Sequence, residues 1–306
     1  MKQNTLKAHL ALFLVNALYA ASHLIAKGVM PSFLSPNVFI AFRVVGATAL
    51  FWVLKTLFFK EKVQRKDFFL LAVCGLFGVT VNQLFFFHGL NLSSAMNSGI
   101  IMTLNPIMVS ILAFFILKEQ LSTYKTLGIM MGAGGAILLT LTASTGNGDS
   151  TLGDVFLIIN ALSYAFFLVL VKPLMQKYSP FTVITYVFTF GTLFVLAYPP
   201  TFMDIFTTDF SVISATVWLK IVYVIVGVTF LTYLLTMYGL KYLSASVSSS
   251  YIYFQPMLVI LFAYVFVAIG LSEDYTNTIT LPKIGYMLMI FFGVFLVVQS
   301  KKWSKN

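Results

Sequence analysis

The sequence predicts an all-α polytopic membrane protein, in which ten transmembrane helices form two five-helix repeats of inverted topology. Three observations lead to this fold class. The composition is strongly apolar, the apolar residues fall into ten separate segments, and the second half of the chain repeats features of the first. We expect the two repeats to occupy residues 1–147 and 148–306.

The composition excludes most soluble classes of protein. Hydrophobic residues make up 59% of the chain and charged residues only 9%, whereas a soluble domain is about one quarter charged. The mean hydropathy is +0.95. The net charge of +10 does not indicate nucleic-acid binding, because the basic residues fall in short loops between apolar runs. The lone cysteine, Cys74, lies in an apolar run, which excludes a disulfide framework and a cysteine metal cluster.

A transmembrane helix needs about 20 mostly apolar residues. The chain contains ten such segments, at residues 8–27, 36–57, 67–88, 94–117, 123–143, 152–173, 179–199, 215–238, 245–269 and 283–300. Pro36 and Pro180 stand at or near the starts of the second and seventh segments, where a proline costs a helix little. The first segment could be mistaken for a signal peptide, but it is about 20 residues long, and Asn16 and His23 interrupt it. Since it also has a counterpart in the second half, we expect it to remain in the mature protein.

The distribution of charge predicts the orientation. With the N-terminus inside, 15 of the 19 basic residues fall in cytoplasmic sections: Lys2, Lys7, Lys55, Lys60, Lys62, Arg65, Lys66, Lys118, Lys125, Lys172, Lys177, Lys241, Lys301, Lys302 and Lys305. The outer loops collect acidic residues instead: Asp149, Asp154, Asp204, Asp209, Glu273 and Asp274. We therefore expect a multi-pass protein of the cytoplasmic (inner) membrane with both termini in the cytoplasm.

The clearest repeat pairs residues 89–113 with residues 239–263, where eight of 25 positions are identical without a gap. Each copy is an apolar segment with an amide–proline pair near its middle, Asn105-Pro106 or Gln255-Pro256. A proline within a helix removes one backbone hydrogen bond and bends the helix, so both prolines are predicted kinks. Matching broken helices in the two halves of a chain are typical of a transporter whose binding site lies between them.

A second repeat supports the same division of the chain. Asn-Ala-Leu at residues 16–18 returns at residues 160–162, and Ser35-Pro36 returns as Ser179-Pro180. Each half contains five predicted spans, an odd number, so the second half enters the membrane in the opposite sense. This is the inverted-topology repeat of many secondary transporters.

Three stretches carry a resemblance to a known family: PNVFIAFR at residues 36–43, the run at residues 82–106, and the pair Lys118-Glu119. On these residues the chain resembles the EamA-type branch of the drug/metabolite transporter superfamily over essentially its whole length. Two features depart from the pattern: Val187 replaces the span 2 arginine in the second half, and a longer loop displaces the pair Glu273-Asp274. The resemblance implies export of amino acids, including aromatic ones and threonine or homoserine, or transport of other small metabolites. It also implies a central substrate cavity lined by spans 1, 3, 4, 6, 8 and 9.

Polar side chains are costly in hydrocarbon, so those within the spans are candidate substrate-binding residues. They are Asn16, Tyr19, Gln83, Asn97, Thr103, Asn160, Tyr164, Tyr233, Tyr253 and Gln255. Asn16 and Asn160 either face each other across the cavity or bond between helices as packing contacts. Gln83 is preferred to its neighbour Asn82, because adjacent residues of a helix point about 100° apart.

Titratable residues suggest further roles. No Asp or Glu falls in the interior of a predicted span, since Asp154 stands at an outer end, and this argues against a buried carboxylate as the carrier of a coupling ion. His23 and His88 remain as candidates for proton coupling, with an interhelical hydrogen bond as the alternative role. Arg43 either has a structural role, snorkelling or bonding freed carbonyls, or binds substrate. Lys27 and Lys172 lie at span ends, where they anchor the helices or gate opposite mouths of the pathway.

The resulting hypothesis is a secondary transporter that exports an amino acid or similar metabolite by alternating access. A passive channel or facilitator is the alternative. The sequence contains no Gly-x-x-x-x-Gly-Lys-Ser/Thr run for ATP binding, and a few scattered histidines do not make the active site of a membrane enzyme. We expect no catalytic activity, no cofactor and no metal. The expected partners are a small-molecule substrate and the lipid bilayer, without nucleic acid, and both a monomer and a homodimer remain open.

Overall fold

The computed structural model describes residues 2–26, 33–58, 60–92, 101–141, 151–255, 257–258, 261–262, 265 and 281–303. The first half contains α1 (Lys2–Ala26), α2 (Pro36–Phe58), η1 (Arg65–Asp67), α3 (Phe68–Gly75), η2 (Leu76–Val81), α4 (Asn82–Leu92), α6 (Asn105–Leu117) and α7 (Thr123–Leu141). The second half contains α8 (Thr151–Lys177), α9 (Pro180–Ala197), α10 (Pro199–Thr207), η3 (Phe210–Val212), α11 (Ala215–Tyr223), η4 (Val224–Leu231), α12 (Thr232–Tyr242), α13 (Ala245–Ser250), η5 (Tyr251–Phe254) and α15 (Leu281–Trp303).

The described part of the chain is helical throughout and contains no β-strand. Among the described residues, five helical stretches are long and apolar enough to cross a membrane: Pro36–Phe58, Arg65–Leu92, Thr151–Lys177, Pro180–Ala197 and Ala215–Tyr242. Two shorter apolar helices cover Asn105–Leu117 and Ile284–Ser300. The protein is therefore an all-α polytopic membrane protein, and each of the ten predicted segments contains described helical residues.

Two prolines begin helices where the sequence predicts it. Pro36 is the first residue of α2, and Pro180 is the first residue of α9. Before α9, the hydroxyl of Ser179 accepts a hydrogen bond from the backbone N–H of Thr182 at 3.2 Å and caps the helix. The missing N–H of a proline costs nothing in the first turn, because that donor has no partner within the helix anyway.

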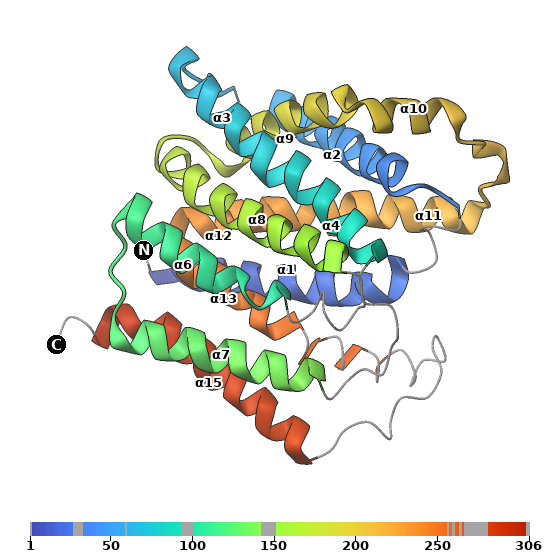
Figure 1. The fold of residues 1–306 in the computed structure, drawn as a ribbon. Coiled ribbons are helices and arrows are strands. Elements are labelled where there is room, and N and C mark those ends of the chain that lie inside the picture. The colour runs from blue at the N-terminus through green and yellow to red at the C-terminus, as the bar shows by residue number, and fades with distance from the viewer. Residues whose placement is uncertain are drawn as a thin grey trace.

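The helices of the two halves are interleaved in the bundle (Figure 1). α2 packs against α9, and α7 packs against α15. α1 packs against α12, while α4 packs against α8. α1 begins and α15 ends at the same end of the bundle, on the left of Figure 1.

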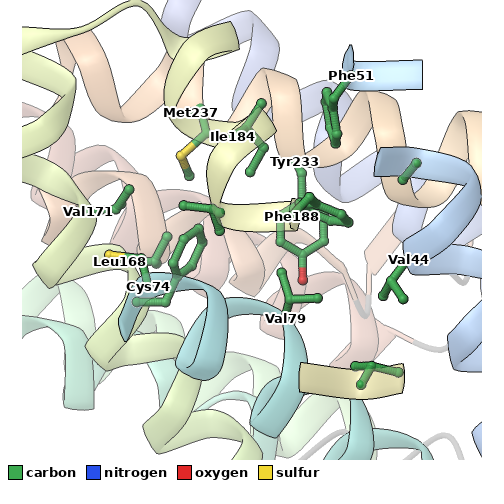
Figure 2. Close-up of a cluster of buried hydrophobic side chains, with 14 of the residues drawn as sticks. Val44, Phe51, Cys74, Val79, Leu168, Val171, Ile184, Phe188, Tyr233 and Met237 are labelled. Carbon is green, nitrogen blue, oxygen red and sulfur yellow. The ribbon is translucent and has the colours of Figure 1, made fainter. Parts of the chain in front are cut away.

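The core consists of two clusters of buried side chains. The larger joins α2, α3, η2, α8, α9 and α12, and includes Phe51, Val79, Phe188 and Tyr233 (Figure 2). The smaller joins α1, α7, η5 and α15. Many large apolar side chains are exposed instead, including Phe115 at 71%. Such an apolar exterior suits contact with lipid.

Three local features differ from the predicted regular spans. Both η2 and η4 are π-helical, in the middle of the third and eighth predicted segments. Short π-helical stretches are frequent at functional sites. The helix α10 occupies a stretch predicted as an outer loop, and the carboxylate of Asp204 in it accepts hydrogen bonds from Ser35 Oγ at 2.7 Å and Asn37 Nδ2 at 2.9 Å. These bonds tie α10 to the start of α2.

The predicted kink at Pro106 takes another form. Residues Thr103 and Leu104 form a turn, and α6 begins at Asn105, so Pro106 lies in its first turn rather than within a continuous helix. The prediction of a bent helix is corrected to a helix start, because a proline is best accommodated there. At the matching place in the second half, the 3₁₀ turn η5 precedes Gln255. Pro256 itself lies outside the described residues.

Candidate functional site

The two amide–proline positions each contact the Asn-Ala-Leu run of the opposite half. Asn105 Nδ2 donates to the carbonyl of Ala161 at 3.0 Å. Gln255 Nε2 donates to Asn16 Oδ1 at 2.9 Å. The two most conspicuous repeats of the sequence therefore meet in space, once at the backbone of Ala161 and once at the side chain of Asn16. Each pairing crosses between the halves of the chain.

Asn16 and Asn160 each form hydrogen bonds that hold the helices together. Asn16 Nδ2 donates to the carbonyl of Leu12 at 2.7 Å, while Asn16 Oδ1 accepts the hydrogen bond from Gln255 Nε2. Asn160 Nδ2 donates to the carbonyl of Asn82 at 2.7 Å. Both residues are buried, with exposed fractions of 5% and 3%. These bonds favour the packing alternative for the two asparagines.

A second group of predicted residues gathers around the π-helical segments. Tyr233 in α12 donates from its hydroxyl to the carbonyl of Gly78 in η2 at 2.9 Å, and Figure 2 shows this hydroxyl pointing from α12 towards Val79. The Tyr19 hydroxyl accepts from Thr232 Oγ1 at 3.1 Å. The ring centre of Phe167 lies 6.0 Å from that of Tyr164 and 6.3 Å from that of Tyr233, so Phe167 joins the two tyrosines. These three tyrosines therefore belong to one region between α1, α8, η2 and α12, in which Tyr233 is buried and Tyr19 and Tyr164 are partly buried.

Gln83 and Arg43 belong to the same region. The Arg43 Nε donates to Thr229 Oγ1 in η4 at 3.0 Å, and Arg43 lies within electrostatic reach of Tyr19 and Tyr233. Gln83 is 3% exposed, and its Oε1 has no hydrogen-bond partner among the described residues. Buried polar atoms are nearly always bonded, so an unpaired one marks a position where a ligand or water can bind. We name Tyr19, Arg43, Gln83, Tyr164, Thr229, Thr232 and Tyr233 the tyrosine–arginine cluster.

Other predicted residues lie away from this cluster. The Tyr253 ring packs against α7, where a Cβ on Gly132 would lie 2.4 Å from Tyr253 Cδ2. Its hydroxyl has no partner among the described residues. Thr103 is buried in the turn before α6. His88 Nε2 lies 2.9 Å from Asn37 Oδ1, at the start of α2. Asn97 and Lys27 lie outside the described residues, as does the side chain of His23 in α1.

Lys172 and Glu119 connect helix ends where α1 begins. The Lys172 ammonium donates to the carbonyls of Leu240 and Leu243 at the end of α12. Glu119 accepts from Lys125 Nζ at 3.0 Å, from the backbone N–H of Ala245 at 2.9 Å and from Ser246 Oγ at 2.9 Å. Lys172 and Glu119 both line a hollow of about 450 Å³ at this end of the bundle.

Several residues that form these hydrogen bonds were not predicted from the sequence as functional residues. Thr229 and Thr232 received no role, although a signal was present: Gly-Val-Thr occurs at residues 78–80 and again at 227–229, inside both π-helical segments. The role of Glu119 in holding the start of α13 was missed because its partners lie more than a hundred residues away. In the described part of the chain, no three His, Cys, Asp or Glu side chains are placed to hold a metal ion.

Tyr233→Phe is expected to lower the free energy of unfolding by about 1 kcal/mol, because the carbonyl of Gly78 loses a buried hydrogen bond while the ring still packs. The measurement is thermal unfolding of the purified protein in detergent. Tyr242→Phe is the matched control, since that ring is 39% exposed. Equal melting temperatures for the two variants would contradict a role of the Tyr233 hydroxyl in joining α12 to η2.

The architecture and the buried polar contacts define a class: a helical membrane protein with polar groups gathered between its two halves, as in membrane transporters. The EamA-like transporter family model matches this chain twice, over residues 6–141 and 151–299, so the chain belongs to that family. The family is part of the drug/metabolite transporter superfamily. The protein is therefore a membrane transporter.

Individual relatives agree with this assignment. The chain is 27% identical to the uncharacterized transporter YetK of Bacillus subtilis, over 89% of this chain and 80% of YetK. It is 24% identical to an uncharacterized transporter of Archaeoglobus fulgidus, over 88% of this chain and 91% of the relative. A WAT1-related protein of Arabidopsis thaliana is 27% identical over 57% of this chain and 54% of its own length.

A solved crystal structure shares the fold. It matches with a TM-score of 0.73 at 16% sequence identity, over 100% of each chain. At this identity the likeness concerns the fold alone.

Proposed function

We propose that this protein is a secondary transporter that exports an amino acid or similar small metabolite by alternating access through a central cavity. The proposal includes ten transmembrane helices in two inverted five-helix repeats, residues 1–147 and 148–306. It places the protein in the cytoplasmic membrane with both termini in the cytoplasm, in agreement with the distribution of basic residues.

One observation carries the proposal: the contacts between the halves occur in reciprocal pairs. The repeat relates α1 to α8, and the stretch α3–η2–α4 to α11–η4–α12. The contact of α1 with α12 then corresponds to that of α8 with α4, and the contact of α2 with η4 corresponds to that of α9 with η2. The pairs α2–α9 and α7–α15 correspond to themselves. This is the pattern of two like units related by a pseudo-twofold axis.

The reciprocal contacts also support alternating access. Each half presents the same kinds of element to the other, so an exchange of their roles converts one packing into another of similar energy. The amide contacts Asn105–Ala161 and Gln255–Asn16 both reach the Asn-Ala-Leu run of the opposite half, at neighbouring positions of that run. Rocking of one repeat against the other is a recognised route to alternating access.

Solute counterflow tests the proposed function. Proteoliposomes that contain the purified protein are loaded with unlabelled solute. The entry of labelled amino acids is then measured with and without a pH gradient. Saturable counterflow of at least one amino acid is expected. Flux that never saturates would instead indicate the channel alternative, and transport independent of pH would remove His23 and His88 as coupling residues.

Gln255→Leu is expected to reduce the counterflow rate by about fivefold, since it removes a partly buried hydrogen bond between the halves. Membrane insertion should be unchanged, because leucine is at least as apolar as glutamine. Gln176→Leu is the control, since the Gln176 side chain is exposed at the end of α8. Undiminished counterflow in the Gln255 variant would mean that this contact has no part in transport.

A further inference from the structure

Arg43 is a buried cation in the middle of the bundle. It lies in α2, eight residues into a helix that is long and apolar enough to span the membrane, and its side chain is only 6% exposed. The guanidinium stacks over the ring of Phe87, 4.7 Å from the ring centre, and lies 5.7 Å from the centre of Phe39. A buried charge is costly in a membrane and is usually paired.

No carboxylate pairs with Arg43 in the described part of the chain. The two ion pairs there join Lys125 to Glu119 and Lys177 to Asp67. Of the four other described acidic side chains, three accept hydrogen bonds from other groups: Glu61 from the N–H of Ser179, Asp204 from Ser35 and Asn37, and Asp209 from Ser211. The fourth, Asp154, also interacts with another group. The positive charge of Arg43 is therefore offset by aromatic rings and one hydroxyl alone among these residues.

The hydrogen-bonding capacity of Arg43 is also largely unused. Its Nε–H donates to Thr229, which in turn donates to the carbonyl of Val224 within η4. A guanidinium has further N–H donors in a planar fork, and for these the described residues supply no hydrogen-bond acceptor. Such a fork matches the two oxygens of a carboxylate.

The second half of the chain shows that this arginine is not needed to build the fold. Val187 stands at the place of Arg43 in α9 and is fully buried. The threonine of η2, Thr80, donates to the carbonyl of Gly191 at 3.1 Å and needs no arginine. A π-helical segment with the same Gly-Val-Thr sequence therefore forms in both halves, although only one half carries the cation. Formation of a π-helical segment at this place therefore does not by itself require an arginine.

We propose that Arg43 binds the carboxylate group of the transported solute, with Tyr19 and Tyr233 beside it and the rings of Phe39 and Phe87 as apolar neighbours. The inference rests on the proposed transport function and narrows its substrates to solutes that carry a carboxylate. It also assigns the tyrosine–arginine cluster, rather than the Asn16–Gln255 contact, as the place where that group is held.

A binding experiment tests the proposal without requiring transport. Acetate, benzoate and L-phenylalanine are added to the purified protein in detergent, and thermal stabilisation is measured against acetamide, benzamide and L-phenylalaninamide. Each amide has nearly the shape of its acid but lacks the carboxylate. Saturable stabilisation by at least one acid, and none by its amide, is expected. Equal effects of acid and amide, or no effect of any acid, would overturn the proposal.

Variants locate the binding group. Arg43→Gln is expected to weaken binding of the acid by more than about tenfold, because it removes charge-assisted hydrogen bonds. Arg43→Lys keeps the charge but not the fork and should have a smaller effect. Lys55→Gln is the matched control: Lys55 is another buried cation of α2, stacked on Trp52 and Tyr186, but with a carbonyl acceptor on Glu61. Unchanged acid binding by either folded Arg43 variant, relative to this control, would overturn the assignment.

The binding experiment and the counterflow experiment distinguish failure of the carboxylate site from failure of the proposed transport function. Binding of acids that depends on Arg43, without counterflow, would overturn the transport function but retain the carboxylate site. Counterflow of solutes without a carboxylate, unaffected in Arg43→Lys, would retain the transport function and overturn the carboxylate site.

Discussion

Gly293→Val is expected to prevent α15 from packing on α7 and to lower the free energy of unfolding by at least about 3 kcal/mol. A Cβ at residue 293 would lie 2.5 Å from the backbone nitrogen of Gly132 and 2.7 Å from the carbonyl oxygen of Gly128. Neither atom belongs to a side chain that can rotate away, so the two helices would have to separate. Small residues at such contacts are the usual way in which membrane helices approach closely.

Gly285→Val provides the matched control on the same helix. No atom lies within 4 Å of a Cβ at residue 285, so this variant should stay within about 0.5 kcal/mol of the unchanged protein. The comparison requires the melting temperature and the monodisperse yield of each purified variant in detergent. If Gly293→Val were as stable as Gly285→Val, the close approach of α7 and α15 would be wrong.

Glu119→Gln is expected to lower the free energy of unfolding by about 3 kcal/mol, because it leaves the ammonium of Lys125 buried without its anionic partner. The side chains of Glu119 and Lys125 are only 15% and 6% exposed. The same carboxylate holds the start of α13 through the N–H of Ala245 and the hydroxyl of Ser246. The variant should therefore weaken the contact of α13 with the end of α6 as well as lose an ion pair.

The pH dependence follows from the pKa of Glu119. Burial raises this pKa, but the charge and hydrogen bond of Lys125, with the bonds from Ser246 and Ala245, outweigh burial and leave it below its ordinary value of 4.5. A lowered carboxyl pKa adds stability that is present above the ordinary value and is lost as the pH falls through the folded-state value. The stabilisation by Glu119 should therefore persist at neutral pH and disappear below pH 4.5.

Thermal unfolding at a series of pH values checks both the loss of stability in Glu119→Gln and its dependence on pH. The difference in stability between the unchanged protein and Glu119→Gln should be large at pH 7 and shrink below pH 4.5. Asp67→Asn is the control, since the Asp67–Lys177 pair lies at the surface and is screened by solvent. A deficit in the Glu119 variant that stays constant down to pH 3 would show that its charge is not the cause.

The transmembrane segments and the family could be predicted from the sequence because they depend on local properties. A bilayer demands long apolar runs with internally bonded backbones, and these runs are visible without knowledge of their neighbours. The starts of α2 at Pro36 and α9 at Pro180 were correct for the same reason, since the preference of proline for a first turn is local. The repeat in residues 89–113 and 239–263 likewise needs only the chain itself.

The partners of the buried polar groups could not be predicted in this way. Gln255 donates a hydrogen bond to Asn16, which is 239 positions away in the sequence, and Tyr233 donates one to the carbonyl of Gly78, which is 155 positions away. Nothing near either residue in the chain indicates these pairings. Pro106 was expected to bend a helix and instead starts one, because the turn at Thr103 and Leu104 ends the helix before it.

By itself, then, the sequence determined that this protein is a helical membrane transporter of the EamA-like family and which polar residues enter the apolar segments. The hydrogen-bond partners of these polar residues depend on how the helices pack. The asparagines pair between helices, Tyr253 packs on α7, and Arg43 lies unpaired by any described carboxylate beside Tyr19 and Tyr233. The physical reason is that a buried polar group must take its partners from whichever helix lies beside it, and packing rather than sequence order determines that neighbour.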